Sequence, residues 1–293
     1  MNTTWLATAS GARGRRNVIS RIMLALTVLA TLIAVTPLFF ILGWLLIQGI
    51  RYLNLDFFIK DPAPIGEAGG GVRNGIVGTL IMSGIALLIA VPVGVFTGIF
   101  LAEYRNNPVA TAVRFATDVL AGIPSIVVGI FVYTIIVLPR WFQGAAFSGF
   151  AGGVALAVII IPILVRTTEE ILKLVPASIR EAAAALGVPK WDYTLTVVVP
   201  SAFGGNVTGV MLGLARAAGE TAPLLLTALG NAFFNAKLSE PMAALSLQIF
   251  TYAIAPFDEG RRLAFAAAFV LIMLVLLVNI LTRYVFRVRS INL

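Results

Sequence analysis

Long apolar stretches without a charged residue limit most strongly how this chain can fold. The first covers residues 22–50 and the second covers residues 74–102. Each is longer than the ~20 residues that a helix needs to cross the hydrocarbon core of a bilayer. Only 12% of the 293 residues are charged, whereas soluble domains carry about 25% charged residues. The sequence therefore predicts an all-α polytopic membrane protein.

Four further apolar stretches bring the number of predicted transmembrane helices to six. They cover residues 113–138, 147–165, 202–228 and 263–282. Residues 51–73 form the loop after the first span. Within the segment 231–262, the uncharged part 241–257 predicts a short helix that lies at the surface.

Five of the six predicted spans contain a proline. In a membrane such positions survive where neighbouring helices or a cavity satisfy the freed carbonyl groups. Helices bent around a pathway and simple packing kinks both remain open. The prolines are Pro37, Pro92, Pro124, Pro162 and Pro223.

Lysine and arginine are distributed unequally between the two sides that six spans define. The side with both termini carries 13 of these residues and the other side carries 7, with Arg216 inside a span. Cytoplasmic loops of membrane proteins carry the excess of positive charge. We therefore expect residues 1–21 and 284–293 to be cytoplasmic tails and residues 51–73 to be extracytoplasmic.

The composition excludes several kinds of chemistry. The chain has no cysteine and no histidine, so it has no disulfide, no Ser-His-Asp triad and no Cys- or His-ligated metal. Its net charge of +8 does not indicate nucleic acid, because the cations cluster at the ends of apolar runs. No catalytic residue and no metal ligand is predicted.

One polar stretch, residues 178–200, separates the fourth and fifth predicted spans. Ser178 and Glu181 have the spacing of a capping box at a helix start. Gly187 suits a left-handed residue just after a helix, and Pro189 suits the first turn of a second helix. The stretch therefore predicts two short helices joined at an angle.

The same stretch resembles the coupling loop of ABC importer permeases. That pattern is Glu-Ala-Ala, three residues, Gly, nine residues, and then Ile-x-Leu-Pro, with valines replacing Ile and Leu here. In that family the loop sits in a groove on a cytoplasmic ATPase subunit, which implies that residues 176–200 couple this chain to an ATPase. The alternative is a solvated loop helix whose glutamate is only a cap. The matching residues are Glu181, Ala182, Ala183, Gly187 and Pro200.

The fifth predicted span carries small residues at every fourth position. Such a stripe allows another helix to approach closely. Its members are Gly205, Gly209, Gly213 and Ala217.

Arg216 and Glu220 are the only charged residues that the sequence places well inside a span. An ionisable group at mid-membrane costs at least ~2.5–3.5 kcal/mol, so both should face protein or a watery path. One interpretation is an internal ion pair that only balances charge. The other is an anion site, because a guanidinium donates bidentate hydrogen bonds to an oxyanion. Glu220 would then tune Arg216 or pair with a cation on a partner subunit.

Residues 215–225 look like the signature of PstA-type permeases of the phosphate ABC importer, and residues 123–127 and 55–58 are also similar to that family. The resemblance implies a type I ABC importer permease fold over residues 74–283 and a role for Arg216 and Glu220 in phosphate passage. It implies a heterodimer with a PstC-type permease in the inner membrane. It also implies two ATPase subunits that bind the ATP, and an extracytoplasmic phosphate-binding protein. This chain itself would be neither an enzyme nor a cofactor protein.

Other functions remain as alternatives. A permease for a related oxyanion, or the PstC-type sister subunit, would share most of these features. An ion-coupled secondary transporter is less compatible, because the two halves show no clear repeat and the coupling-loop pattern is present. An intramembrane enzyme is the weakest alternative, because histidine and cysteine are absent.

Overall fold

The computed structural model describes residues 4–64, 67, 69–139 and 147–285, and within these ranges the chain forms helices and no β-strand. The all-α prediction is confirmed. Residues 1–3 of the predicted N-terminal tail and 286–293 of the C-terminal tail lie outside the described residues.

Within the described residues, four helices are long and apolar enough to cross a membrane. The first, α1, begins at Thr4, so the predicted N-terminal tail continues the helix of the first span. The fourth predicted span continues past residue 165 to Lys173 and carries charged residues in its last two turns. The four are α1 (Thr4–Ile50), α3 (Arg73–Glu103), α6 (Gly149–Lys173) and α13 (Asp258–Val285).

Two further candidate spans are bent pairs of helices. In the first, α4 (Pro108–Gly122) is followed by α5 (Ser125–Val132) and the π-helix η1 (Tyr133–Val137), with a bend of 103°. Ile123 and Pro124 have extended backbone at the break, because a proline disfavours helical conformation in the residue before it. Pro124 therefore marks a real bend.

The second bent pair differs from the predicted fifth span at 202–228. Residues 190–201 and α10 (Phe203–Gly219) form the pair, with a bend of 70°. After α10 the backbone leaves the helix at Glu220 and resumes as α11 (Ala222–Thr227). Helix α10 begins at Phe203, next to the predicted start, but it ends at Gly219, before the predicted end at 228. Counting each bent pair as one span, length and composition allow up to six.

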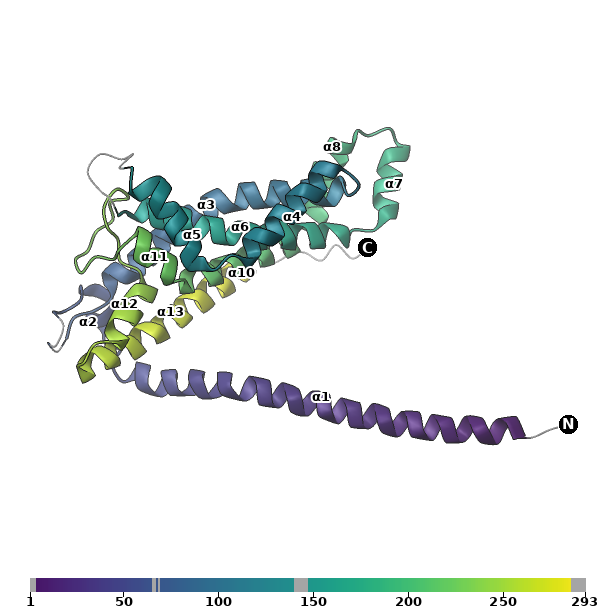
Figure 1. Cartoon of the computed structure of the whole chain (residues 1–293), viewed down its shortest axis with the longest axis horizontal. Coiled ribbons are helices and arrows are strands. Elements are labelled where there is room, and N and C mark those ends of the chain that lie inside the picture. The colour runs from purple at the N-terminus through teal and green to yellow at the C-terminus, as the bar shows by residue number, and fades with distance from the viewer. Residues whose placement is uncertain (1–3, 65–66, 68, 140–146, 286–293) are drawn as a thin grey trace.

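The two ends of the molecule carry different parts of the chain. Figure 1 shows the start of α1, the end of α13 and the segment around α7 and α8 at one end. The short helices α2 (Leu55–Ile59) and α12 (Leu245–Ala253) lie at the other. We predict that the end with α7 and α8 faces the cytoplasm. Hereafter the first is called the inner end and the second the outer end.

Helices α3 and α6 pack closely because glycine stands at their contacts. A Cβ atom added to Gly94 would lie 2.6 Å from the Cβ of Leu164, and one added to Gly153 would lie 2.6 Å from Ile85 Cγ2. Met82 and Ile160 are fully buried in the core cluster around this pair. The two helices therefore lie so close together that a larger residue would not fit at these positions.

The small-residue stripe of α10 packs on the same helix α6, so the predicted close helix contact is made within this chain. Added Cβ atoms would meet Ile171 at 2.5 Å, Thr167 at 2.9 Å and Ile160 at 2.6 Å. Ala217 is buried at the end of the stripe. The glycines in these contacts are Gly205, Gly209 and Gly213, in that order.

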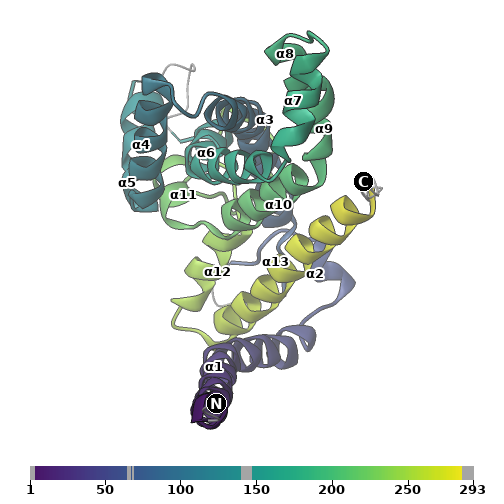
Figure 2. The ribbon, with the colours of Figure 1, turned by 90° about the vertical axis from the view of Figure 1, so that its right-hand side faces the viewer.

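Helix α12 is the short helix predicted within residues 241–257, but it does not simply lie at the surface. Five of its nine residues are buried, and Gln248 donates a hydrogen bond to Asn74 at 2.7 Å. In contrast, α1 runs apart from the helical body in both overall views (Figures 1 and 2). It meets α13 near its end, where Gly49 lies against Phe269.

The contact between α3 and α6 predicts the effect of adding one methyl group. In Gly98→Ala the new Cβ would meet Thr168 Cβ at 2.6 Å and the Val165 carbonyl oxygen at 2.8 Å. We expect a loss of about 1–3 kcal/mol of stability from overpacking. Gly84→Ala on the same helix meets nothing within 4 Å and should be neutral or stabilising. Thermal unfolding in detergent compares them, and equal melting temperatures would contradict the packing.

The charge distribution predicts cytoplasmic termini, and reporter fusions measure this directly. A fusion at Leu293 and one within residues 231–238 should report opposite sides of the membrane. The same side for both would mean that the chain does not cross the membrane between the two sites, and it would contradict the predicted topology.

Candidate functional site

The polar stretch forms the two predicted helices, but the first begins earlier than the capping box indicates. Helix α7 covers Ala177–Ala185, with Pro176 in the capping position and no side-chain hydrogen bond to the helix start. Ser178 therefore lies inside the first turn, and the prediction that it caps is wrong. The backbone of Pro176 is not helical, with φ −55° and ψ 140°, and the helix begins at the next residue.

Gly187 ends α7 as predicted. Its φ is +75°, a conformation that favours glycine. The Gly187 N–H donates to the Ala184 carbonyl at 3.0 Å and the Val188 N–H donates to the Ala183 carbonyl at 3.3 Å. These two bonds form the Schellman arrangement at a helix C-terminus. Pro189 then precedes α8 (Lys190–Tyr193).

Helices α7 and α8 present their side chains outward. No residue of either helix is buried, and the structure describes both completely. The predicted coupling residues Glu181, Ala182 and Gly187 are exposed, and Ala183 is half-buried. Large apolar side chains are exposed beside them: Leu186 is 82% and Trp191 is 67% exposed.

The polar stretch continues into the bend before α10. The π-helix η2 (Thr194–Val198) and α9 (Val199–Ser201) follow α8 without a break. Pro200 lies in α9 and is exposed. Because this segment and α10 form one bent pair, α7 and α8 are joined directly to the helix that carries Arg216.

Arg216 and Glu220 form an ion pair, with 3.2 Å between Arg216 Nε and Glu220 Oε1. Glu220 stands at the end of α10 in extended conformation, and Ser246 Oγ donates to its carbonyl at 2.8 Å. The Glu220 side chain is 13% exposed, whereas that of Arg216 is 56% exposed. The two side chains therefore form an ion pair. More than half of the Arg216 side chain is left uncovered by other residues of this chain.

A cavity of about 70 Å³ lies between Arg216 and the break that joins α4 to α5. Ile123 and Ser125 line it from the break, and Pro162 lines it from α6. The first N–H groups of a helix lack intrahelical acceptors and favour negative charge. The structure thus brings the start of α5 and a guanidinium to the same small space, although they are far apart in the sequence.

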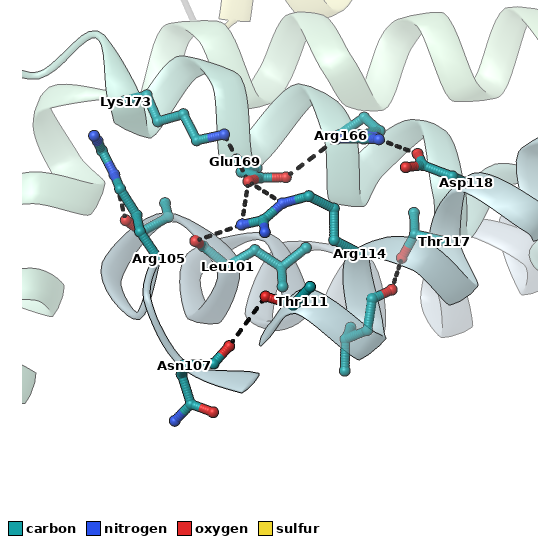
Figure 3. A network of polar contacts seen from close by, with 12 residues as sticks. Leu101, Arg105, Asn107, Thr111, Arg114, Thr117, Asp118, Arg166, Glu169 and Lys173 are labelled. Atoms are coloured by element: carbon teal, nitrogen blue, oxygen red, sulfur yellow. Dashed lines mark hydrogen bonds and ion pairs between the residues drawn. The ribbon is translucent and has the colours of Figure 1, made fainter. Parts of the chain in front are cut away.

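Figure 3 shows a network of polar contacts around a buried carboxylate, which the sequence did not reveal. The side chain of Glu169 is fully buried. Its Oε1 lies 2.8 Å from Arg114 Nη2 and 2.6 Å from Lys173 Nζ. Arg166 Nη1 lies 3.6 Å from Oε2, and the same guanidinium pairs with Asp118 of α4. Three cations surround two carboxylates and tie α4 to α6.

Glu169 lies in the last two turns of α6 and was not predicted as a buried charge. The predicted fourth span ended at residue 165, so Glu169 was assigned to the loop beyond it. Arg166, Glu169 and Lys173 stand three and four residues apart, which places them on one helix face. That spacing was the available signal.

The network also connects to α3. Arg114 Nη2 donates to the Leu101 carbonyl at 3.4 Å, so one side chain joins α3, α4 and α6. Thr117 Oγ1 bonds the Val113 carbonyl within α4. The position of α4, and with it the break at Pro124, therefore depends on these charges.

Comparisons with known proteins agree with this architecture. Residues 94–289 match the family described as "binding-protein-dependent transport system inner membrane component". The phosphate transport system permease protein PstA of Yersinia pestis is 44% identical over 91% of this chain and 90% of its own length. The PstA protein of Pasteurella multocida is 43% identical over 94% of this chain and 97% of its own length.

A solved structure shares the fold at low sequence identity. It is a chain of a bacterial ABC transporter involved in the import of the acidic polysaccharide alginate. The TM-score is 0.56 at 16% identity, and the match covers 93% of this chain and 97% of that chain. At this identity the likeness concerns the fold alone.

The buried network predicts that Glu169 contributes to stability. Glu169→Gln removes the charge that Arg114 and Lys173 face. We expect a loss of about 2–3 kcal/mol, below the ~3–5 of a fully buried pair because the cations are partly exposed. Glu170→Gln, at the exposed neighbouring position, should change little. Thermal unfolding of both variants in detergent checks this, and equal effects would contradict the buried network.

Proposed function

This chain belongs to the family of binding-protein-dependent transport system inner membrane components, and from that premise we propose that it is the PstA-type permease subunit of an ATP-driven importer of inorganic phosphate. The relatives described above carry that name over more than nine-tenths of this chain. Their name favours the PstA type over the PstC-type sister. The fold of an ABC importer permease and several apolar helices fit an inner-membrane location.

The observation that carries the proposed substrate site is the half-exposed Arg216 beside the break at Pro124. Phosphate carries one to two negative charges and loses part of its hydration in a narrow pathway. A guanidinium offers planar, paired donors to such an oxyanion, and the start of α5 adds positive backbone groups. Together they can offset the lost hydration.

Glu220 gives the site a way to release its anion. A fixed cation that bound phosphate permanently would stop conduction, because binding must be weak enough to let the ion leave. The 3.2 Å contact to Glu220 gives Arg216 an intramolecular partner. Phosphate and Glu220 would then compete for the same guanidinium.

The exposed side of Arg216 supports a second permease subunit. A charged group within a membrane-spanning helix should face protein or water instead of lipid. We propose that a PstC-type sister permease completes the pathway at this face. An extracytoplasmic phosphate-binding protein would dock at the outer end, where α2 and α12 lie (Figure 1).

Helices α7 and α8 supply the proposed contact with the ATPase. They lie at the inner end and expose Leu186 and Trp191 together with Glu181. Exposed large apolar side chains next to polar ones are typical of protein interaction sites. Two ATPase subunits would bind the ATP, and this permease would contribute no catalytic residue and no cofactor of its own.

Arg216→Gln tests the substrate site. We expect phosphate uptake to be lost while the complex still assembles, because the variant removes the cation and keeps a polar side chain. Arg216→Lys should restore uptake only in part, because a lysine lacks the paired donors of the guanidinium. Arg21→Gln, at an exposed position of α1, is the matched control for loss of one cation.

The measurements are phosphate uptake, sulfate uptake and the yield of assembled transporter. Near-normal phosphate uptake by Arg216→Gln would contradict a role in passage. Loss of the assembled complex would favour a purely structural ion pair. Preference for sulfate over phosphate in the unmodified transporter would assign a different oxyanion.

A further inference from the structure

The coupling helices α7 and α8 are attached to the helical body through one buried carboxylate, Glu103 at the end of α3. Its side chain is 4% exposed. Arg180 of α7 approaches Glu103 Oε1 with Nη2 at 3.1 Å and Nε at 3.2 Å. Lys190 of α8 donates to the Glu103 carbonyl oxygen at 2.5 Å and lies 3.9 Å from Oε2.

Arg180 also reaches the end of α6. Its guanidinium donates to the Leu172 carbonyl at 2.8 Å and to the Val175 carbonyl at 2.6 Å. The last carbonyl groups of a helix lack intrahelical donors, and a cation there is favourable. One side chain of α7 thus holds the ends of both α3 and α6.

Lys190 adds a contact on the other side of Glu103. Its ammonium lies 4.3 Å from the centre of the Tyr104 ring, a cation–π geometry. Tyr104 in turn stacks on Phe100, with ring centres 5.4 Å apart. Helix α8 is therefore also tied to α3.

Apolar contacts hold α7 and α8 only weakly. No residue of either helix is buried, and Ile179 and Tyr193 are only partly buried against the apolar cluster at this end. An open pocket of about 510 Å³ lies beside the Glu103 contacts. Since no core encloses these helices, the contacts of Glu103, Arg180 and Lys190 set their position.

We infer that Glu103, Arg180 and Lys190 form the joint that transmits movement of α7 and α8 to helices α3 and α6. This inference rests on the proposed function, in which an ATPase subunit moves α7 and α8. Arg180 and Lys190 act as positioning residues. Helices α3 and α6 are packed at glycine contacts and move as a pair, and α6 carries the Glu169 network that ties it to α4. A shift of α7 therefore reaches the break at Pro124 through the helices that line it.

The first test uses the complete transporter in proteoliposomes with Arg180→Ala. Phosphate uptake and ATP hydrolysis are measured on the same samples. We expect uptake per ATP to fall about 3- to 30-fold, the range that altered coupling between sites produces. Arg180→Lys should recover part of the loss, because it keeps a cation that faces Glu103. Arg21→Ala, at an exposed position of α1, should leave the ratio unchanged.

The second test measures the position of α7 without activity. The chain has no cysteine, so Ala184→Cys and Asn106→Cys, both at exposed positions, give a unique pair of spin-label sites. We expect a narrow distance distribution in the full-length chain. Adding Arg180→Ala should broaden it, whereas adding Arg21→Ala should not.

Two results would overturn the inference. One is an unchanged ratio of uptake to hydrolysis in Arg180→Ala, and the other is an unchanged distance distribution in that variant. If the unmodified transporter moves no phosphate, the proposed function fails instead, and the distance measurement still decides whether Arg180 positions α7.

Discussion

The close packing of α3 against α6 is the contact on which the rest of the structure depends. It exists because glycines such as Gly94 and Gly98 stand where the helices approach most closely. Helix α10 uses the same device on another face of α6. Lipid tails are as apolar as the surfaces of membrane helices, so the hydrophobic effect does not drive these helices together. They rely on such small-residue contacts instead. Helix α6 thereby becomes the centre of the fold and fixes the positions of α3 and α10.

Ion pairs then position helix α4, which glycine packing does not hold. Glu169 on α6 holds α4 through Arg114 and, through Arg166, Asp118. Helix α4 ends at the break near Pro124, and that break lies beside Arg216 on α10. The buried carboxylate and the half-exposed guanidinium are thus two parts of one arrangement. The first positions the helices around a small cavity, and the second supplies the cavity with positive charge.

The local features of the candidate site were largely readable from the sequence. Gly187 has the left-handed conformation that its position after the alanines indicated, and the small-residue stripe packs closely as expected. Ser178 does not cap α7, because Pro176, two residues earlier, occupies the capping position. Glu169 was missed because an apolar-run criterion ends a span at the first charged residue. Its burial depends on cations from α4 and from the next turns of α6.

The sequence alone determined the membrane class of this protein, since uncharged runs long enough to cross a bilayer leave helices as the only way to satisfy the backbone. It also determined the turn at Gly187, because that turn depends only on the residues beside it. For Arg216 and Glu220 it left an ion pair and an anion site as alternatives. Only the tertiary structure decided that α10 ends at Gly219 and that α4 meets α5 at 103°. The same holds for the meeting of Arg216 with the start of α5. These features depend on contacts between helices far apart in the chain, and local spacing carries no information about which helix will supply the neighbouring face.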